Sequence, residues 1–269
     1  AGITYIDTAP RYGHGPSERR VGDVVRGRDD VVLSSKVGRL FKADRALKGD
    51  AERHGFRSPM PFDQVYDYSY DAILRSYEDS LQRLGLAEID ILFVHDIGRM
   101  VHGLDHDSTF RQLTRGGGFR ALEELKASGA IRGFGLGVNE WEVCVEAMDH
   151  ADLDVVLLAG RYTLLEQTAL DRFLPACVER QVSVVIGGAY NSGILATGTR
   201  REGPIHYDYG EAPPEVVARV RAIEAICDAY GVPLAAAALQ FPLAHPAVVS
   251  VIPGISSAAR VTQTLALYR

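Results

Sequence analysis

Short apolar runs alternate with helix-like segments along the chain, and this alternation limits the folds that the sequence can adopt. The runs that resemble strands are ITYI, VVLSS, IDILFV, GFGLG, DVVLLA, SVVIG and VVSVI, at residues 3–6, 31–35, 89–94, 133–137, 154–159, 183–187 and 248–252. Helical periodicity lies between them: in residues 69–86, Ile73, Tyr77, Leu81 and Leu84 fall on one face. Residues 117–130, 166–181 and 212–231 are predicted to be helical in the same way. Seven strands in such an alternation predict a parallel sheet.

The pattern best fits an α/β fold of the (β/α)8, or TIM, barrel type. No GxGxxG motif follows an early strand, which disfavours a dinucleotide-binding doubly wound sheet. A closed barrel needs eight strands. We therefore expect the first strand to precede Ala1, so that this chain lacks its first βα unit of roughly 30 residues. We expect residues 1–269 to form one barrel domain, because α/β barrels reach this length as single domains.

Composition and charge argue against several classes of partner. The net charge is -6, with 29 basic and 35 acidic residues interspersed, whereas nucleic acids and anionic membranes require basic clusters. No apolar run has the length of a membrane span. The 3 cysteines lack a CxxC pair, so we expect no metal site, no disulfide framework and a cytoplasmic location. The expected partner is a small-molecule substrate, and the expected assembly is a monomer or small homo-oligomer.

Polar side chains lie at the ends of four successive predicted strands. Asp7 ends the first strand, Lys36 the second and His95 the third, and Asn139 follows the fourth. The carboxyl ends of parallel barrel strands converge on one face, so these side chains are expected to lie within reach of one another. Tyr12 follows Asp7 by five residues in a loop rich in Pro and Gly, and it can fold back over the same face. This arrangement predicts an active site.

The residue types at these strand ends suit proton transfer. A strand-end Asp often caps a helix, and a His after an apolar run is often a core residue, but a buried Lys needs a partner, which Asp7 can provide. A nearby ammonium lowers the pKa of a phenol from its usual value near 10. Tyr12 could then exchange a proton with a C–OH/C=O pair while His95 orients the substrate oxygen. A bound nicotinamide cofactor would provide the missing hydride chemistry.

The motifs that carry these residues resemble the aldo-keto reductase superfamily. YIDTAPRYG contains Asp7 and Tyr12, LSSKVG contains Lys36, and LFVHD contains His95. The resemblance extends over essentially the whole chain and implies a (β/α)8 barrel that binds NAD or NADP. It also implies a catalytic tetrad of Asp7, Tyr12, Lys36 and His95, with Tyr12 as the proton-transfer residue. By the same resemblance, Asn139 holds the carboxamide of the nicotinamide.

Departures from the family pattern concern the nicotinamide ring. The family's glutamine on strand six falls at Ala159, and the aromatic residue that stacks on the ring falls at Gly187. We expect Tyr190, in the loop that follows, to replace that aromatic contact. The motif YNSGILATG resembles the loop that passes over the pyrophosphate, which implies cofactor contacts from Ser192, Gly193 and Leu195.

The segment after the last strand bears on the choice between NAD and NADP. Family members that prefer NADP carry a lysine that meets the 2′-phosphate, and this chain has Gly254 there while keeping Arg260. Ser256 and Gln263 are neutral and can bind ribose hydroxyls. The loss of the lysine predicts a preference for NAD, with NADP as a possible second cofactor.

The residue after the tetrad histidine points to the substrate. Many aldose reductases have Trp there, whereas this chain has Asp96, which suits a polyhydroxylated substrate. LSSKVGRL, VHDIG, LLAGRYTLL and NSGILATG are most similar to the branch of L-fucose and D-threo-aldose 1-dehydrogenases and pyridoxal 4-dehydrogenase. The resemblance implies oxidation of the anomeric C1 hydroxyl of an aldose to a lactone, with Asp96 and Tyr190 at the substrate.

Other functions remain open from the sequence. The same machinery could oxidise pyridoxal, as a cyclic hemiacetal, to a pyridoxolactone. A hypothesis from another class is a cofactor-sensing interaction subunit like the β-subunits of potassium channels, which the intact tetrad makes weaker. A metal-dependent hydrolase is weaker still, because no HxH motif closes a predicted strand. Three long connections, at residues 37–69, 99–118 and 199–214, are functional or disordered by their length.

Overall fold

A computed structural model describes residues 2–47, 52–53, 55–57 and 59–268. Two compact units make up the chain. The N-terminal unit comprises Gly2–Val138 and Glu146–Val156, and the C-terminal unit comprises Asn139–Val145 and Leu157–Arg269.

Parallel strands form the main sheet. They are β1 (Tyr5–Asp7), β2 (Val32–Val37), β5 (Ile91–His95), β6 (Gly133–Val138), β7 (Val155–Ala159), β8 (Ser183–Gly187) and β11 (Val248–Ile252). Their order in the 7-stranded sheet is the order of the chain, which is the arrangement of a (β/α) barrel. Each strand overlaps one of the predicted runs, so the predicted α/β fold of barrel type is confirmed.

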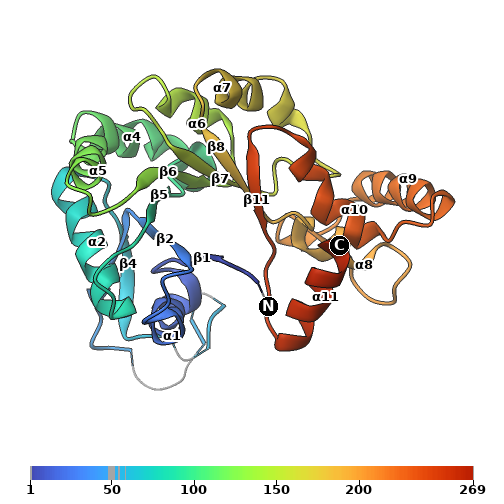
Figure 1. The fold of residues 1–269 in the computed structure, drawn as a ribbon, viewed down its shortest axis with the longest axis horizontal. Coiled ribbons are helices and arrows are strands. Elements are labelled where there is room, and N and C mark those ends of the chain that lie inside the picture. The colour runs from blue at the N-terminus through green and yellow to red at the C-terminus, as the bar shows by residue number, and fades with distance from the viewer. Residues whose placement is uncertain (1, 48–51, 54, 58, 269) are drawn as a thin grey trace. The chain divides into compact units, whose positions relative to one another are not determined.

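The N-terminal unit contains β1, β2, β5 and β6 with the helices that cover them. These helices are α1 (Pro16–Val25), α2 (Tyr70–Leu84) and α5 (Gly118–Ala127), and α2 packs against both α1 and α5 (Figure 1). A Cβ atom on Gly22 of α1 would lie 1.8 Å from the backbone oxygen of Leu84, so only glycine allows this close approach of the two helices. The helix α2 ends at Leu84 and is capped by Gly85, whose φ of 64° is left-handed.

Two of the three long connections lie in the N-terminal unit and contain secondary structure. Residues 37–69 contain β3 (Arg39–Ala43) and β4 (Phe62–Tyr66), which pair in antiparallel fashion. Residues 99–118 contain α3 (Arg99–His102), the 3-10 turn η2 (Gly103–Asp105) and α4 (His106–Thr114). A further 3-10 turn, η1 (Tyr12–His14), lies in the loop between β1 and α1.

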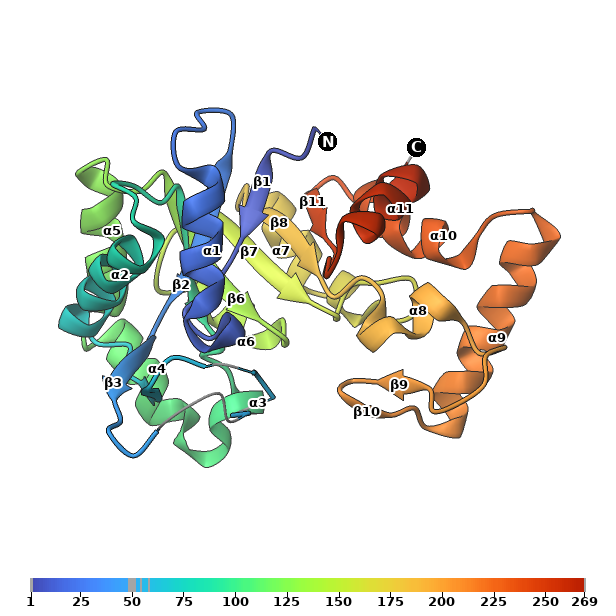
Figure 2. The same cartoon turned by 90° about the horizontal axis from the view of Figure 1, so that it is seen from below.

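The C-terminal unit contains β8 and β11, the end of β7, and most of the later helices. The longer helices are α7 (Phe173–Glu179), α9 (Pro214–Ala229), α10 (Leu234–Gln240) and α11 (Ala258–Tyr268); α6 (Glu142–Ala147) begins in this unit and ends in the other. Short turns precede α7 and α8 (Ile194–Thr197) and follow α10: η3 (Thr168–Leu170), η4 (Asn191–Gly193) and η5 (Phe241–Ala244). The third long connection forms a hairpin of β9 (His206–Tyr207) and β10 (Gly210–Glu211), visible near α8 and α9 in Figure 2.

The predicted helix at residues 166–181 differs from the structure. It is divided into η3 and α7, and the chain leaves helical geometry at Arg172, whose φ is -139°. The reason is Pro175, which has no amide hydrogen and whose ring clashes with the carbonyl four residues earlier. A helix can therefore hold Pro175 only in its first turn, which fixes the start of α7 near Phe173.

Across the described residues, no single helix is both long enough and apolar enough to cross a bilayer. Pro214–Ala229 and Leu234–Ala244 satisfy the requirement only as a pair, which is bent by 101°.

Candidate active site

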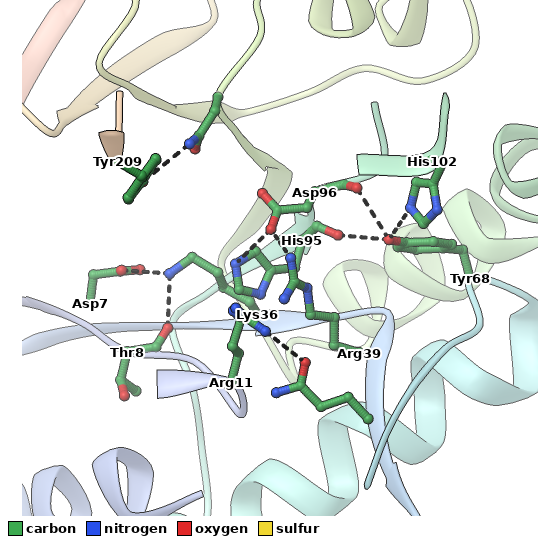
Figure 3. Close-up of polar contacts among 12 residues, drawn as sticks. Asp7, Thr8, Arg11, Lys36, Arg39, Tyr68, His95, Asp96, His102 and Tyr209 are labelled. Atoms are coloured by element: carbon green, nitrogen blue, oxygen red, sulfur yellow. Dashed lines mark hydrogen bonds and ion pairs between the residues drawn. The ribbon is translucent and has the colours of Figure 1, made fainter. Parts of the chain in front are cut away.

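A buried ion pair joins the first two parallel strands. Asp7 ends β1, and its carboxylate Oδ2 accepts a hydrogen bond of 2.5 Å from Nζ of Lys36 on β2. The same Nζ donates to the backbone oxygen of Thr8 at 3.0 Å, and Lys36 is only 1% exposed. The other oxygen of Asp7 accepts a hydrogen bond of 2.7 Å from Ser34 Oγ. Both carboxylate oxygens are therefore fixed, and the ammonium is held in one place (Figure 3).

Tyr12 lies over this ion pair. It begins η1, where its amide donates to the backbone oxygen of Ala9 at 3.1 Å, and this turn brings it back toward β2. Nζ of Lys36 is 4.5 Å from the centroid of the Tyr12 ring, and the ring of His95 packs edge-on against Tyr12 at 5.9 Å between centroids. The structure thus brings the four predicted tetrad residues together within the N-terminal unit.

The environment of Tyr12 acts on its pKa in both directions. Burial makes the largest contribution and raises the pKa of the phenol above its usual value of 10.0, while the charge of Lys36 lowers it and that of Asp7 raises it. The pKa of Tyr12 is raised on balance, so the predicted lowering by Lys36 is present but is outweighed by burial. Burial also acts to lower the pKa of Lys36, but the charges of Asp7 and Tyr12 outweigh it and raise that pKa, so the amine stays charged.

His95 is neutral at physiological pH. It ends β5, and burial, followed by the positive charges of Arg39, Lys36 and Arg11, lowers its pKa well below 6.5. Its Nε2 lies 3.6 Å from Oδ2 of Asp96, and its Nδ1 is buried with no hydrogen-bond partner among the described residues. A neutral imidazole can donate one hydrogen bond to a substrate oxygen without giving up its proton.

Arg39 is a residue at this site that sequence reasoning missed. It begins β3, and its Nη2 forms an ion pair with Oδ2 of Asp96. The guanidinium carbon also lies 4.9 Å from the centroid of the Tyr66 ring. The sequence could have indicated it, because Arg39 is a second cation only three residues after Lys36 and stands among apolar residues. Oδ2 of Asp96 is therefore already paired, and the expectation that Asp96 accepts hydroxyl groups of a sugar stays a prediction.

Asn139 lies in the C-terminal unit, at a cavity of about 210 Å³. The cavity is lined by Asn139, Ala159, Gly160, Arg161, Gly188, Asn191, Ser192, Asp208 and Tyr209. The Asn139 side chain donates to the hydroxyl of Tyr209 at 3.3 Å, and its backbone oxygen accepts a hydrogen bond of 2.7 Å from Nε of Arg161. Among the residues predicted to bind the cofactor, Asn139 and Ser192 lie at this cavity.

The hairpin β9–β10 was not predicted and supplies one wall of the cavity. Its two turn residues, Asp208 and Tyr209, have φ of 47° and 66°, as in the tight two-residue turns that join antiparallel strands. Oxygens of Asp208 accept hydrogen bonds from Nη2 of Arg161 at 3.1 and 3.2 Å, and the amide of Tyr209 donates to Ser192 Oγ at 3.1 Å. The signal in the sequence is the turn-forming Asp and Gly that flank Tyr209.

Two predicted residues have their side chains in the hydrophobic core of the C-terminal unit instead. Leu195 is fully buried in a cluster with Leu165, Ile194 and Val220, and its amide donates to the backbone oxygen of Tyr190 at 3.1 Å. Tyr190 packs against the same cluster, while Tyr209 is the tyrosine that lines the cavity. Gly193, with φ of 98°, provides the left-handed residue before α8, and a Cβ there would meet no atom within 4 Å.

The residues predicted for the adenosine end of the cofactor lie at the exposed start of α11. Gly254, Ser256, Arg260 and Gln263 are all exposed. The amide of Arg260 donates to Ser257 Oγ at 3.3 Å, which orders the first turn. A Cβ built on Gly254 would meet no atom within 4 Å, so this position accommodates a longer side chain.

The residues of the C-terminal unit fit a nicotinamide cofactor. Ala159, Gly160 and Gly188 leave room in the cavity, where larger side chains would fill it. The amide of Asn139 offers both a donor and an acceptor for a carboxamide at the cavity wall. Polar groups held at fixed positions around a hollow are typical of cofactor sites.

The fold and the buried Asp–Lys–Tyr–His arrangement define an oxidoreductase of the barrel class, and the match to the aldo/keto reductase family over residues 1–269 shows that the chain belongs to that family. Members of this family are enzymes that use NAD(P)(H). This chain is accordingly an NAD(P)-dependent oxidoreductase.

Two relatives are particularly similar in sequence. Pyridoxal 4-dehydrogenase of Microbacterium luteolum is 49% identical over 98% of this chain and 79% of its own length. D-threo-aldose 1-dehydrogenase of a Pseudomonas species is 41% identical over 98% of this chain and 78% of its own length. Among solved structures, the holo form of an aldo-keto reductase of Bacillus halodurans matches with a TM-score of 0.72 and 27% identity, over 99% of this chain and 77% of that one.

Proposed function

We propose that this enzyme oxidises the lactol carbon of a cyclic hemiacetal to a lactone, and that its substrate is pyridoxal or a closely similar ring. The observation that carries the proposal is the buried Lys36 ammonium, which Asp7 binds on one side and which lies against Tyr12 on the other. This arrangement suits removal of the hydroxyl proton of a lactol by the Tyr12 phenolate.

Each residue of the site has a defined role in this reaction. The O–H bond of the lactol breaks as Tyr12 takes the proton, Lys36 stabilises the phenolate that takes it, and Asp7 keeps Lys36 in place. The neutral His95 donates a hydrogen bond to the reacting oxygen and orients it. A bound NAD(P) would supply the acceptor for the hydride that leaves this carbon as the carbon becomes a carbonyl. Asn139 and Ser192 are proposed to hold the nicotinamide end, and the start of α11 the adenosine end.

Pyridoxal is favoured over an aldose by three observations. The pyridoxal 4-dehydrogenase is the more similar of the two relatives, at 49% against 41% identity. Asp96, the carboxylate that suggested a sugar, is already paired with Arg39. Tyr12 and Tyr66 are each 36% exposed and offer aromatic surface on which a pyridine ring can stack. An aldose of the L-fucose or D-threo type is the second candidate.

A substrate panel tests the proposal. We expect kcat/KM for pyridoxal to exceed that for L-fucose by at least about tenfold, a difference of roughly 1.4 kcal/mol in transition-state binding. The measurement is the initial rate of reduced-cofactor formation at saturating NAD, with identification of the lactone product. A higher kcat/KM for L-fucose would restore the aldose as the substrate, and a lack of lactone from either compound would contradict the proposed reaction.

We also propose that NAD is preferred over NADP by at least about tenfold in kcat/KM. The 2′-phosphate of NADP calls for cations, and the open position at Gly254 provides none. Arg260 can stack on an adenine instead of binding a phosphate. Gly254→Lys is expected to move the preference toward NADP, and Gly254→Ala, which adds no charge, is the matched control. An unmutated enzyme that prefers NADP would show this proposal to be wrong.

A further inference from the structure

Arg39 is a buried cation whose hydrogen-bonding capacity is only partly used. The residue is 4% exposed, and one of its nitrogens, Nη2, pairs with Asp96. Its Nε and Nη1 are buried and have no hydrogen-bond partner among the residues that the structure describes. Buried donors of a charged group are costly to leave unpaired, so these two N–H groups require an explanation.

The backbone at Asp96 holds this arginine beside the reacting centre. Asp96 has a φ of 52°, which is an uncommon conformation for a residue other than glycine. The hydroxyl of Tyr68 donates to the backbone oxygen of His95 at 2.8 Å, and the amide of Asp96 donates to that of Gly137 at 3.0 Å. In this conformation Oδ2 of Asp96 contacts both Arg39 and, at 3.6 Å, Nε2 of His95. The guanidinium and the imidazole thus share one carboxylate oxygen (Figure 3).

The charges around His95 favour a ligand with a negative oxygen. Lys36 is balanced by Asp7, and Arg39 is balanced by Asp96. Arg11 adds a further cation, and its Nη1 donates to the neutral side chain of Gln64 at 3.1 Å. The site therefore contains three cations and two carboxylates from these residues, which leaves one positive charge in excess.

We propose that Arg39 is a specificity-determining residue. Its Nη1–H binds the oxygen that the substrate carries on the ring atom next to the carbon that bears the lactol. In pyridoxal this is the ring phenolate oxygen, and this inference rests on the proposed function. A guanidinium presents its donors in a rigid plane that suits an anionic oxygen, and contact with the Tyr66 ring helps to keep that plane in place. Asp96 then positions Arg39 through Nη2, and the substrate phenolate accepts a hydrogen bond from Nη1.

The experiment compares two ligands that differ by one oxygen. Binding of 4-pyridoxolactone and of its 3-deoxy analogue is measured by calorimetry with saturating NADH. The wild type is compared with Arg39→Lys, which keeps the charge but lacks the guanidinium and its Nη1 donor. We expect loss of the oxygen to weaken binding to the wild type by about 10- to 100-fold, and binding to Arg39→Lys by less than about threefold. Lys42→Met, at an exposed cation on the same strand, is the control and is expected to discriminate like the wild type.

Each outcome decides between a role in recognition and a structural role. Equal binding of the two lactones by the wild type would overturn the proposal even if Arg39→Lys does not fold. The proposal would also be overturned if a folded Arg39→Lys variant showed the same difference in affinity between the two lactones as the wild type. Turnover of pyridoxal is measured in the same preparations. If pyridoxal is oxidised but the two lactones bind equally, only the role of Arg39 is overturned. If the wild type distinguishes the two lactones but does not oxidise pyridoxal, only the proposed function is overturned. Failure of the wild type to bind either lactone overturns both.

A second pair of ligands tests whether Arg39 binds a sugar hydroxyl instead of a phenolate oxygen. L-Fucose carries a hydroxyl on C2, next to its reacting C1, and the lactone of 2-deoxy-L-fucose lacks it. The wild type could bind L-fuconolactone more tightly than that 2-deoxy lactone and yet bind the two pyridoxolactones equally. If Arg39→Lys also abolished the difference between the sugar lactones, Arg39 would not be binding a phenolate. It would assign the residue to a neutral sugar hydroxyl and overturn the proposed contact with an anionic oxygen.

Discussion

Replacement of Tyr12 by phenylalanine is expected to lower kcat for lactol oxidation by about 10²- to 10⁴-fold, the usual effect of removing a general acid–base group. The substitution removes only the hydroxyl, and the ring contacts with Lys36 and His95 remain available. We therefore expect a fold and a cofactor affinity close to those of the wild type. Steady-state kinetics, with circular dichroism and cofactor titration on the same sample, provide the measurement.

Tyr70→Phe is the matched control for this substitution. Tyr70 begins α2, and its hydroxyl contacts Glu124 near the surface, away from the tetrad. Its loss is expected to change kcat by less than about twofold, because an exposed hydrogen bond of this kind contributes little. A Tyr12→Phe enzyme with nearly the kcat of the wild type would mean that another group accepts the proton.

The same variant gives a prediction for pH dependence. Oxidation needs the phenolate form of Tyr12, and burial raises the pKa of this phenol above 10.0. The phenolate fraction, and with it kcat/KM for oxidation, is therefore expected to increase from about pH 7 to about pH 10 in the wild type. The residual activity of Tyr12→Phe should lack this increase. A wild-type rate that is independent of pH over this range would contradict the role of Tyr12.

The second large effect concerns stability. Glu18→Ala is expected to lower the free energy of unfolding by about 3–5 kcal/mol, because it breaks a buried ion pair and leaves a cation without its partner. Glu18 of α1 is fully buried; it accepts hydrogen bonds of 2.6 Å from Ser35 Oγ on β2 and of 2.5 Å from Nε of Arg83 on α2. One carboxylate thus links two helices and a strand. Thermal unfolding should shift down by roughly 6–20 °C.

Asp23→Ala on the same helix is the control. Asp23 pairs with Arg26 at 3.2 Å, but the two side chains are 75% and 56% exposed. Exposed pairs of this kind contribute about 0–1 kcal/mol, so the midpoint of unfolding should change little. Similar losses of stability in Glu18→Ala and Asp23→Ala would show that burial of the Glu18 pair is not what stabilises this unit.

Much of the fold could be predicted because the signals for it are local. Apolar runs between amphipathic segments locate all the parallel strands, and the order of the strands follows from their alternation with helices. Asp7, Lys36 and His95 could be singled out for the same reason, since each is a polar residue at the end of a predicted strand. Their proximity in the structure depends only on parallel pairing of neighbouring strands.

Other features depended on contacts between distant segments, and only the tertiary structure decided them. Arg39 and Asp96 are 57 positions apart, and Arg161 and Asp208 are 47 apart, so no periodicity in the sequence relates them. The net direction of the Tyr12 pKa shift is of the same kind, because it is a balance between burial and two opposite charges. The sequence by itself determined which residue types stand at the strand ends. Three-dimensional packing determined their partners and how far each is removed from water, because desolvation and pairing depend on every segment that surrounds a group.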